Sequence, residues 1–360
     1  MIHSLTSFRF AAAFMVFLYH VKLFPQYELG TAGVQFFFVL SGFILAWNYH
    51  SKFKPFDNAN IYKFYKARFA KIYPIHLLTF LLAAPLVILY FHPNGLYMLK
   101  LAFMSVINLL LIQSYIPNEG TYFNFNGVSW TLSVEALFYL SFPFLLRLMI
   151  KWKTGGQAAA SLTAIFLLWL LLFWLNSYLN EANPFSAWLL HIFPFTRLFE
   201  FSTGMVLGLL FVERTGNPPR LQLLNVLEWV GLAAFFGLLI ASKYMPAGMV
   251  RGVYFVPVWC LFIYVFAFQA GTVSRLLSHR LFVYLGEISF SFYMIHQLVI
   301  RYVQLVRLDS PLGIFVCFAI SLLLSAVIYR WYEEPLRKRI RFGSRKRPQA
   351  PANPLPVESA

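Results

Sequence analysis

Residues 161–175 read SLTAIFLLWLLLFWL, a run without a charged side chain. A second such run, LTFLLAAPLVILYF, covers residues 78–91. Uninterrupted apolar stretches are typical of membrane-spanning helices, whereas the strands of a membrane barrel alternate apolar and polar residues. Both stretches therefore predict helices that cross a lipid bilayer.

The composition of the whole chain supports this interpretation. Of its 360 residues, 60% are hydrophobic and 12% are charged, and that charged share is about half the share of a typical soluble domain. The mean hydropathy is +0.67. Cys260 and Cys317 both lie inside apolar runs, so we interpret them as packing residues rather than as a disulfide or a metal pair. We expect an all-α polytopic membrane protein.

Ten apolar stretches are long enough to be spans, and an eleventh run covers residues 99–114. Cytoplasmic loops of membrane proteins are enriched in Lys and Arg. If ten stretches cross, all five strongly basic segments lie in the cytoplasm, so we predict that 99–114 is a re-entrant or interfacial helix. The ten predicted spans lie near residues 6–25, 32–50, 72–91, 128–148, 158–178, 186–211, 225–242, 251–270, 282–306 and 311–331.

This topology divides the chain into a transmembrane domain at 1–335 and a basic tail at 336–360, disordered at its end, with both termini in the cytoplasm. The net charge of +16 comes from loops and tail, which argues against nucleic-acid binding. The first span could instead be a signal peptide, but no soluble domain follows it. We expect membrane lipid as a partner.

Arg9 and His20 bracket ten mostly apolar residues of the first span. Their spacing is about three helical turns, so they should lie on nearly one face, about 16 Å apart. An ionisable group in hydrocarbon costs about 2.5 to 3.5 kcal/mol on insertion scales and needs a partner, a cavity or a function. The simpler alternative is that Arg9 binds lipid head groups and His20 is a packing residue.

Glu135 lies in the span that begins with GVSWTLSVEALFYL at residues 127–140, at an expected depth close to that of His20. We predict that the two pair, because a carboxylate fixes the tautomer of an imidazole and raises its basicity, as a general base requires. A purely structural pair is the alternative. The groups expected to line the same cavity, or else simply to pack, are Gln35, Ser41, Gly42, Trp130 and His296.

The segment YKFYKARFAKIYP at residues 62–74 alternates basic and aromatic side chains. It could form an amphipathic helix on anionic lipid, or a pocket for a phosphorylated, adenine-bearing ligand. Elsewhere, Arg197 and Glu200 are three residues apart and should form a pair inside the bundle. The histidines show no metal-ligand spacing, so we expect no metal.

Six blocks in succession resemble the acyltransferase 3 family of membrane O-acyltransferases, over nearly the whole chain. In order they are SLTSFRFAAAFMVFLYH at 4–20, GVQFFFVLSGFILAW at 33–47, ARFAKIYP at 67–74, GVSWTLSVEALFYLSFPFLL at 127–146, LGEISFSFYMIHQ at 285–297 and WYEEPLRKR at 331–339.

The resemblance implies a bundle of about ten helices in a bacterial plasma membrane. It implies transfer of an acyl group, usually acetyl, from cytoplasmic acyl-CoA to a hydroxyl of a cell-envelope or exported carbohydrate or glycolipid. Acyl-CoA is then a substrate, and no bound cofactor is expected. Because only a short tail follows the last span, onward transfer outside the membrane would need a separate protein. Whether the chain forms a homo-oligomer stays open.

The family's essential arginine and histidine of the first span match Arg9 and His20. Its basic block often has two arginines three apart, and here the second is Lys71, which keeps the charge but loses the bidentate geometry. We expect the acyl-CoA to be bound by Arg68, Lys66, Lys71 and Tyr73. His20 would act as the base or as the covalent carrier of the acyl group. A transporter or flippase of a lipid-linked glycan, or a scaffold, is the rival interpretation.

Overall fold

The computed structural model describes residues 2–53, 56–91, 94–150, 155–177, 183–306 and 310–343. Within these ranges the chain forms helices and turns, without a β-strand. The α-helices are α1 (His3–His20), α2 (Leu29–Tyr49), α3 (Asn58–Phe91), α4 (Leu96–Leu109), α5 (Glu119–Tyr122), α6 (Trp130–Met149), α7 (Gly155–Ser177), α8 (Pro184–Ala187), α9 (Pro194–Arg214), α10 (Leu221–Ala241), α11 (Ala247–Gly252), α12 (Val256–Ala267), α13 (Thr272–Leu277), α14 (Arg280–Leu305), α15 (Pro311–Ile328) and α16 (Glu334–Phe342).

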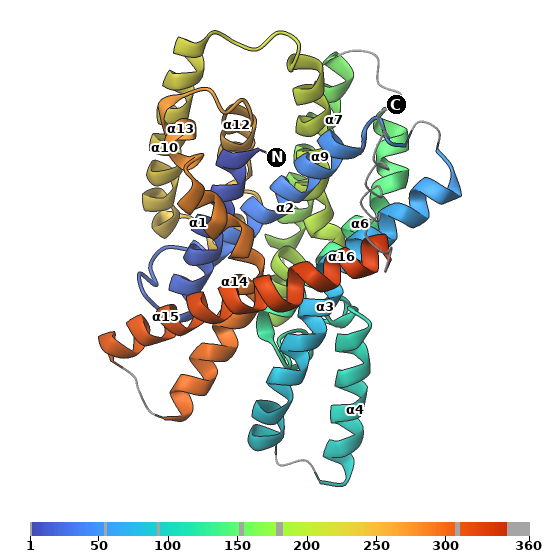
Figure 1. Ribbon diagram of the computed structural model, residues 1–360, viewed down its shortest axis with the longest axis vertical. Helices are drawn as coiled ribbons and strands as arrows, with labels where there is room; N and C mark the ends of the chain where they lie inside the picture. Colours follow the sequence, from blue (N-terminus) through green and yellow to red (C-terminus); the bar gives the residue numbers. More distant parts are fainter. Residues whose placement is uncertain are drawn as a thin grey trace, which may run out of the picture.

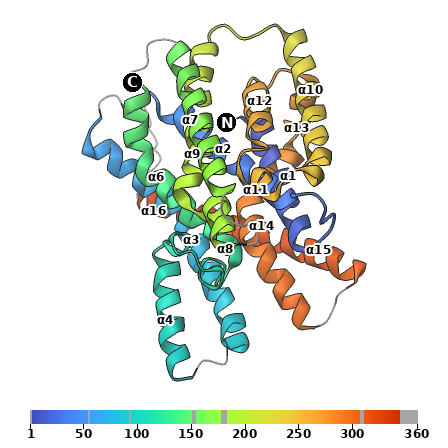
Figure 2. The ribbon, with the colours of Figure 1, turned by 180° about the vertical axis from the view of Figure 1, so that it is seen from behind.

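Five shorter turns connect or extend these helices. Three are 3₁₀ turns, η1 (Gln113–Tyr115), η2 (Gly127–Ser129) and η4 (Ser242–Tyr244), and two are π-helical, η3 (Trp188–Ile192) and η5 (Tyr329–Glu333). In Figure 1 the helices α1, α2, α9 and α14 cross at the centre of the molecule, and Figure 2 shows α8 and α11 on the opposite face.

By length and composition, nine helical segments of the described chain could cross a membrane. They coincide with the second to tenth predicted spans, so the chain is an all-α, multi-pass membrane protein. The first predicted span, 6–25, is not among them, since α1 begins with polar residues and its helix ends at His20. The backbone then turns, with positive φ at Lys22 and Phe24. That the first helix also crosses stays a prediction.

The predicted non-crossing run at 99–114 corresponds to α4 and η1. Helix α4 is apolar but has 14 residues, which gives a length of about 21 Å, short of the roughly 30 Å of hydrocarbon. It lies beside the second half of α3 at the lower end of the view in Figure 1. Its relation to the membrane stays a prediction.

Helices α2 and α9 pack so closely that no side chain fits at Gly42 or Gly204. A Cβ atom at Gly42 would overlap the carbonyl oxygen of Phe201, and one at Gly204 would overlap that of Val39. Gly208 follows Gly204 after three residues, the small-residue spacing that lets membrane helices approach closely. Gly42, which we expected to line a cavity, is therefore a packing residue.

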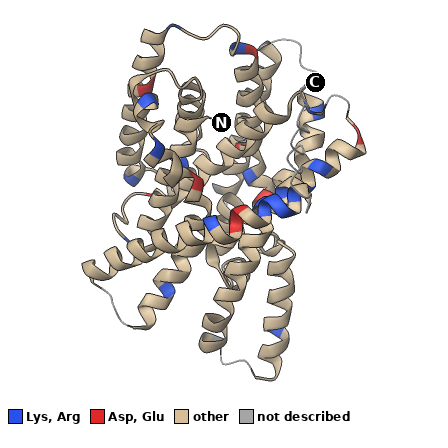
Figure 3. Ribbon diagram, viewed as in Figure 1, with Lys and Arg blue, Asp and Glu red and all other residues tan. Residues whose placement is uncertain are grey.

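Helices α15 and α16 continue one another through the π-helical turn η5 and run across the front of the molecule in Figure 1. The predicted domain boundary after residue 335 thus falls inside α16, which packs against α3. The remainder of the predicted tail, 344–360, lies outside the described residues. Figure 3 shows that the charges of α16 form a band across this region, whereas the lower ends of α3 and α4 carry almost none.

Candidate functional site

Two cavities lie near the centre of the bundle. The first, which we call the basic cavity, has a volume of about 340 Å³. It is lined by residues of α1, α2, α3, α6 and α14, most of them apolar. Its charged and hydrogen-bonding side chains are Thr6, Arg9, Ser41, Asn48, Arg68, Lys71, Thr131, Glu135, Tyr139 and Tyr293.

The described acidic side chains make no hydrogen bond or ion pair with the cations of the basic cavity. In the described part of the chain, neither a hydrogen bond nor an ion pair joins Arg9, Arg68 or Lys71 to another protein group. The Nε of Arg68 is buried and unpaired, and its guanidinium lies 5.8 Å from the ring centroid of Tyr139. Half-buried cations without a hydrogen-bonded counter-charge are costly, so this cavity favours an anionic ligand.

Glu135 lines the basic cavity with these cations. Its Oε2 accepts a hydrogen bond of 2.7 Å from the hydroxyl of Tyr139, one helical turn further along α6. Glu135 is also close enough to Arg9 and Lys71 to interact with them electrostatically. The carboxylate therefore lowers the positive charge of the cavity without cancelling it.

The second cavity, which we call the histidine cavity, has a volume of about 300 Å³. It is formed by the end of α1, the start of α2, α5, η2, α6, α8, η3, α11 and α14, and its lining is more polar. Its polar and aromatic side chains are Tyr19, His20, Glu28, Thr31, Glu119, Tyr122, Phe123, Trp130, His191, Arg251 and Tyr293.

Several side chains that line the histidine cavity form ion pairs or ring contacts with one another. The Nη2 of Arg251 lies 3.6 Å from Oε1 of Glu28. The rings of Trp130 and His191 lie 5.2 Å apart, centroid to centroid. A mixture of flat aromatic faces and paired polar groups suits an uncharged polar ligand better than a polyanion.

His20 does not pair with Glu135, contrary to the expectation from sequence. Its Nδ1 lies 2.9 Å from the carbonyl oxygen of Val16 and 3.1 Å from Nε2 of His296. The reason is the direction of the side chains around α6: Trp130 faces the histidine cavity, while Thr131 and Glu135, one turn apart on another face, line the basic cavity. Similar depth along two helices does not place side chains on facing sides.

Val34 and Tyr293 border both cavities. The hydroxyl of Tyr293 donates a hydrogen bond of 3.2 Å to Oγ1 of Thr131, so the ring is held in place from α6. The two spaces therefore meet at these side chains, with Arg9 on one side and His20 on the other.

Of the other predicted site residues, some line one of the two cavities and the others lie outside both. Ser41 lines the basic cavity and Trp130 the histidine cavity, whereas His296 is fully buried behind His20. Lys66 and Tyr73 line neither cavity, and Tyr73 stacks on Phe69 with ring centroids 4.6 Å apart.

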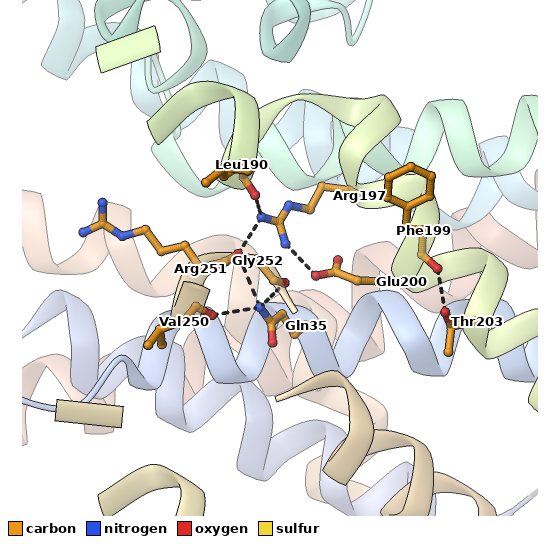
Figure 4. A network of polar contacts seen from close by, with 9 residues as sticks. All are labelled: Gln35, Leu190, Arg197, Phe199, Glu200, Thr203, Val250, Arg251 and Gly252. Carbon is orange, nitrogen blue, oxygen red and sulfur yellow. Dashed lines mark hydrogen bonds and ion pairs between the residues drawn. The ribbon is translucent and has the colours of Figure 1, made fainter. Parts of the chain in front are cut away.

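Gln35, expected in the cavity lining, is instead part of the buried network in Figure 4. Its Nε2 donates to the carbonyl oxygen of Gly252 at 2.7 Å. The expected pair of Arg197 and Glu200 forms nearby with an N to O distance of 2.6 Å, and Arg197 also donates to the carbonyl oxygens of Leu190 and Arg251. This network ties η3 and α11 to α2 and α9, and so supports one wall of the histidine cavity.

Sequence reasoning missed His191 and Tyr293. His191 lies near the end of a predicted span, and its position on η3 beside Trp130 follows only from the fold. Tyr293 is three residues before His296 on α14, a spacing that places both on neighbouring parts of one helix face. Among the described residues, no group of three or more His, Cys, Asp or Glu could hold a metal ion.

Comparison with known proteins gives a consistent result. A family model described as an acyltransferase domain matches residues 2–330. The acyltransferase MdmB of Streptomyces mycarofaciens is 32% identical over 332 residues, which cover 83% of this chain and 79% of MdmB. The O-acetyltransferase OatA of Staphylococcus aureus is 23% identical over 351 residues, covering 93% of this chain but only 57% of OatA. No solved structure matches.

Proposed function

Since the chain belongs to the acyltransferase 3 family of membrane acyltransferases, we propose that it moves an acyl group from acyl-CoA to a hydroxyl of a carbohydrate or glycolipid. The acyl-CoA occupies the basic cavity, and the acceptor occupies the histidine cavity. OatA is named as an O-acetyltransferase, which supports acetyl as the group and oxygen as the acceptor atom.

The observation that carries the proposal is the meeting of the two cavities at Val34 and Tyr293. The unpaired cations Arg9, Arg68 and Lys71 lie on one side, and charge-assisted hydrogen bonds to phosphate are among the strongest that a protein can make. Most of the remaining lining of this cavity is apolar and extends to Val34, which suits a long, uncharged pantetheine arm.

The reaction conserves atoms and charge. In the direct route, His20 takes the proton of the acceptor hydroxyl, the oxygen attacks the thioester carbonyl, the C–O bond forms and the C–S bond breaks. The proton then passes from His20 to the leaving thiolate, which departs as the CoA thiol. In the alternative route, His20 attacks the thioester first, so that a C–N bond forms and the C–S bond breaks. The acyl group then passes from the imidazole to the hydroxyl oxygen, and the hydroxyl proton goes to the departing thiolate.

On the membrane, this proposal puts the basic cavity on the cytoplasmic side, where acyl-CoA is found, and the histidine cavity towards the opposite side. The positive-inside distribution of the basic loops supports that orientation, as does the density of charge along α16 and α3 in Figure 3. Both termini are then cytoplasmic, in the plasma membrane of a bacterium.

The test is release of free thiol from acetyl-CoA by the purified full-length protein in detergent, with direct measurement of acetyl-CoA binding. We expect wild type to bind acetyl-CoA and to release thiol, and His20→Ala to bind it without releasing thiol. Failure of wild type to bind acetyl-CoA contradicts the proposal and favours the transporter interpretation, because a transporter needs no acyl donor.

A further inference from the structure

His20 and His296 form a hydrogen-bonded pair between α1 and α14. Nδ1 of His20 lies 3.1 Å from Nε2 of His296, and the ring centroids are 5.1 Å apart. His20 borders the histidine cavity, whereas His296 is completely buried. Within the described chain, the pair has no carboxylate partner for either ring.

The hydrogen bonds of His296 decide which of its nitrogens carries a proton. Nδ1 of His296 lies 3.2 Å from the carbonyl oxygen of Phe292, and a carbonyl oxygen can only accept. Nδ1 therefore carries the hydrogen, and in the neutral ring Nε2 is left with a lone pair. A neutral ring is the form expected here, because His296 is buried without a counter-charge.

The hydrogen bonds of His20 point to the same arrangement. Nδ1 of His20 faces two acceptors, the carbonyl oxygen of Val16 at 2.9 Å and the lone pair on Nε2 of His296. Both require a hydrogen on Nδ1 of His20. Its other nitrogen, Nε2, is then the unprotonated one, and no described residue bonds to it.

We propose that His296 is a positioning residue that holds His20 in the tautomer with a free Nε2. His296 thus fixes the tautomer of His20 with a neutral imidazole, which is the role that we predicted from sequence for Glu135. When His20 takes up a proton at Nε2, its positive ring donates a stronger hydrogen bond to His296, so the buried lone pair also stabilises the charged form. This inference rests on the proposed function of His20 in acyl transfer.

The rings around His296 keep its orientation fixed. Phe292 lies parallel to it, with centroids 5.9 Å apart and planes at 15°, and Phe17 approaches edge-on at 6.2 Å. A ring clamped in this way cannot turn to offer its other nitrogen. The geometry therefore favours a role in orientation over direct contact with a substrate.

Three variants of the full-length protein test the inference. His296→Leu removes the acceptor, whereas His296→Gln can present an amide oxygen near the position of Nε2. His76→Leu is the matched control, because His76 is equally buried but bonds to the carbonyl oxygen of Asn108 and lines neither cavity.

For His296→Leu we expect kcat to fall about 10- to 100-fold, the range seen when the partner of a metal-bound histidine is removed. The KM for acetyl-CoA should stay unchanged, and His296→Gln should recover most of kcat. His76→Leu should keep the wild-type kcat. Full kcat in the Leu variant, or equal losses in the Leu and Gln variants, would overturn the inference.

A spectroscopic measurement separates this inference from the proposed function. In protein labelled with ¹⁵N-histidine, the shifts of the two His20 nitrogens report which one carries the hydrogen, whether or not the protein is active. We expect the hydrogen on Nδ1 in wild type and a mixture of tautomers in His296→Leu. A hydrogen on Nε2 of wild-type His20 would overturn the positioning role, even if thiol release is confirmed.

Discussion

The basic cavity and the histidine cavity are nearly equal in volume, about 340 and 300 Å³, but opposite in charge. The basic cavity has three cations and one carboxylate, a formal charge of +2, whereas the histidine cavity has Arg251 against Glu28 and Glu119, a formal charge of −1. This difference in charge is what the proposed function requires, because it assigns an anionic donor to one cavity and an uncharged acceptor to the other.

In the proposed reaction, the same difference would keep the acyl donor and the acceptor apart until they react. The positive charge of the basic cavity attracts the phosphates of a donor, whereas the negative charge of the histidine cavity repels them. The wall that the two cavities share, Val34 and Tyr293, is apolar and aromatic. A small uncharged acyl group is the part of acyl-CoA best suited to pass such a wall.

The largest effect is expected from His20→Ala. Loss of a general base typically costs about 10²- to 10⁴-fold, so kcat for thiol release and transfer should fall by that amount. The dissociation constant for acetyl-CoA should not change, because His20 does not line the basic cavity. Thiol assays and equilibrium binding on equal amounts of folded protein check both. Parallel loss of binding and rate would mean that the cavities are not separate in function.

Arg68→Ala should weaken acetyl-CoA binding by about 10- to 100-fold, since a hydrogen bond to a charged group contributes about 1.5 to 3 kcal/mol. Lys66→Ala is the matched control, because Lys66 lies two residues away on α3 but does not line the cavity. Its binding constant should stay within about twofold, as expected for a partly exposed charge outside the cavity. Equal losses in the two variants would show that the basic block acts only as a diffuse positive surface.

Much of the fold followed from sequence because span length and apolar composition are local properties. Nine of the ten predicted spans coincide with apolar helices of sufficient length. Helix ends were harder: α1 ends at His20, where a turn with two positive φ angles begins. Turn geometry of this kind has no apolar signature, so the predicted first span ran five residues too far.

The site was only partly predictable, because sequence gives the depth of a residue but not its direction around the helix. Adjacent residues of a helix point about 100° apart, and thus Trp130 and Thr131 border different cavities. The grouping of Arg9 with the basic block and the pairing of His20 with His296 both depend on the crossing of α1 with other helices. Those crossings are set by packing of distant segments.

Glu135→Gln distinguishes the role predicted from sequence, orientation of His20, from the position of Glu135 in the basic cavity. If Glu135 oriented His20, the variant should lose kcat as His20→Ala does. The structure places the carboxylate among the cations of the basic cavity, so removal of its charge should tighten acetyl-CoA binding, by about fivefold for roughly 1 kcal/mol of relieved repulsion. Calorimetry of acetyl-CoA binding and the kcat of the same sample distinguish the two, and a large loss of kcat with unchanged binding would favour the original pair.

The smallest effect is expected at the wall itself. Val34→Ala removes two methyl groups from the place where both cavities meet, which leaves room for a longer acyl chain. Each added methylene that is buried there contributes about 0.8 kcal/mol, so the ratio of kcat/KM for propionyl-CoA to that for acetyl-CoA should rise about fourfold. Val39→Ala is the control, since Val39 is also buried on α2 but lines neither cavity. An unchanged ratio in Val34→Ala would show that the acyl group does not pass Val34. The acyl group would then have to reach the histidine cavity by another route.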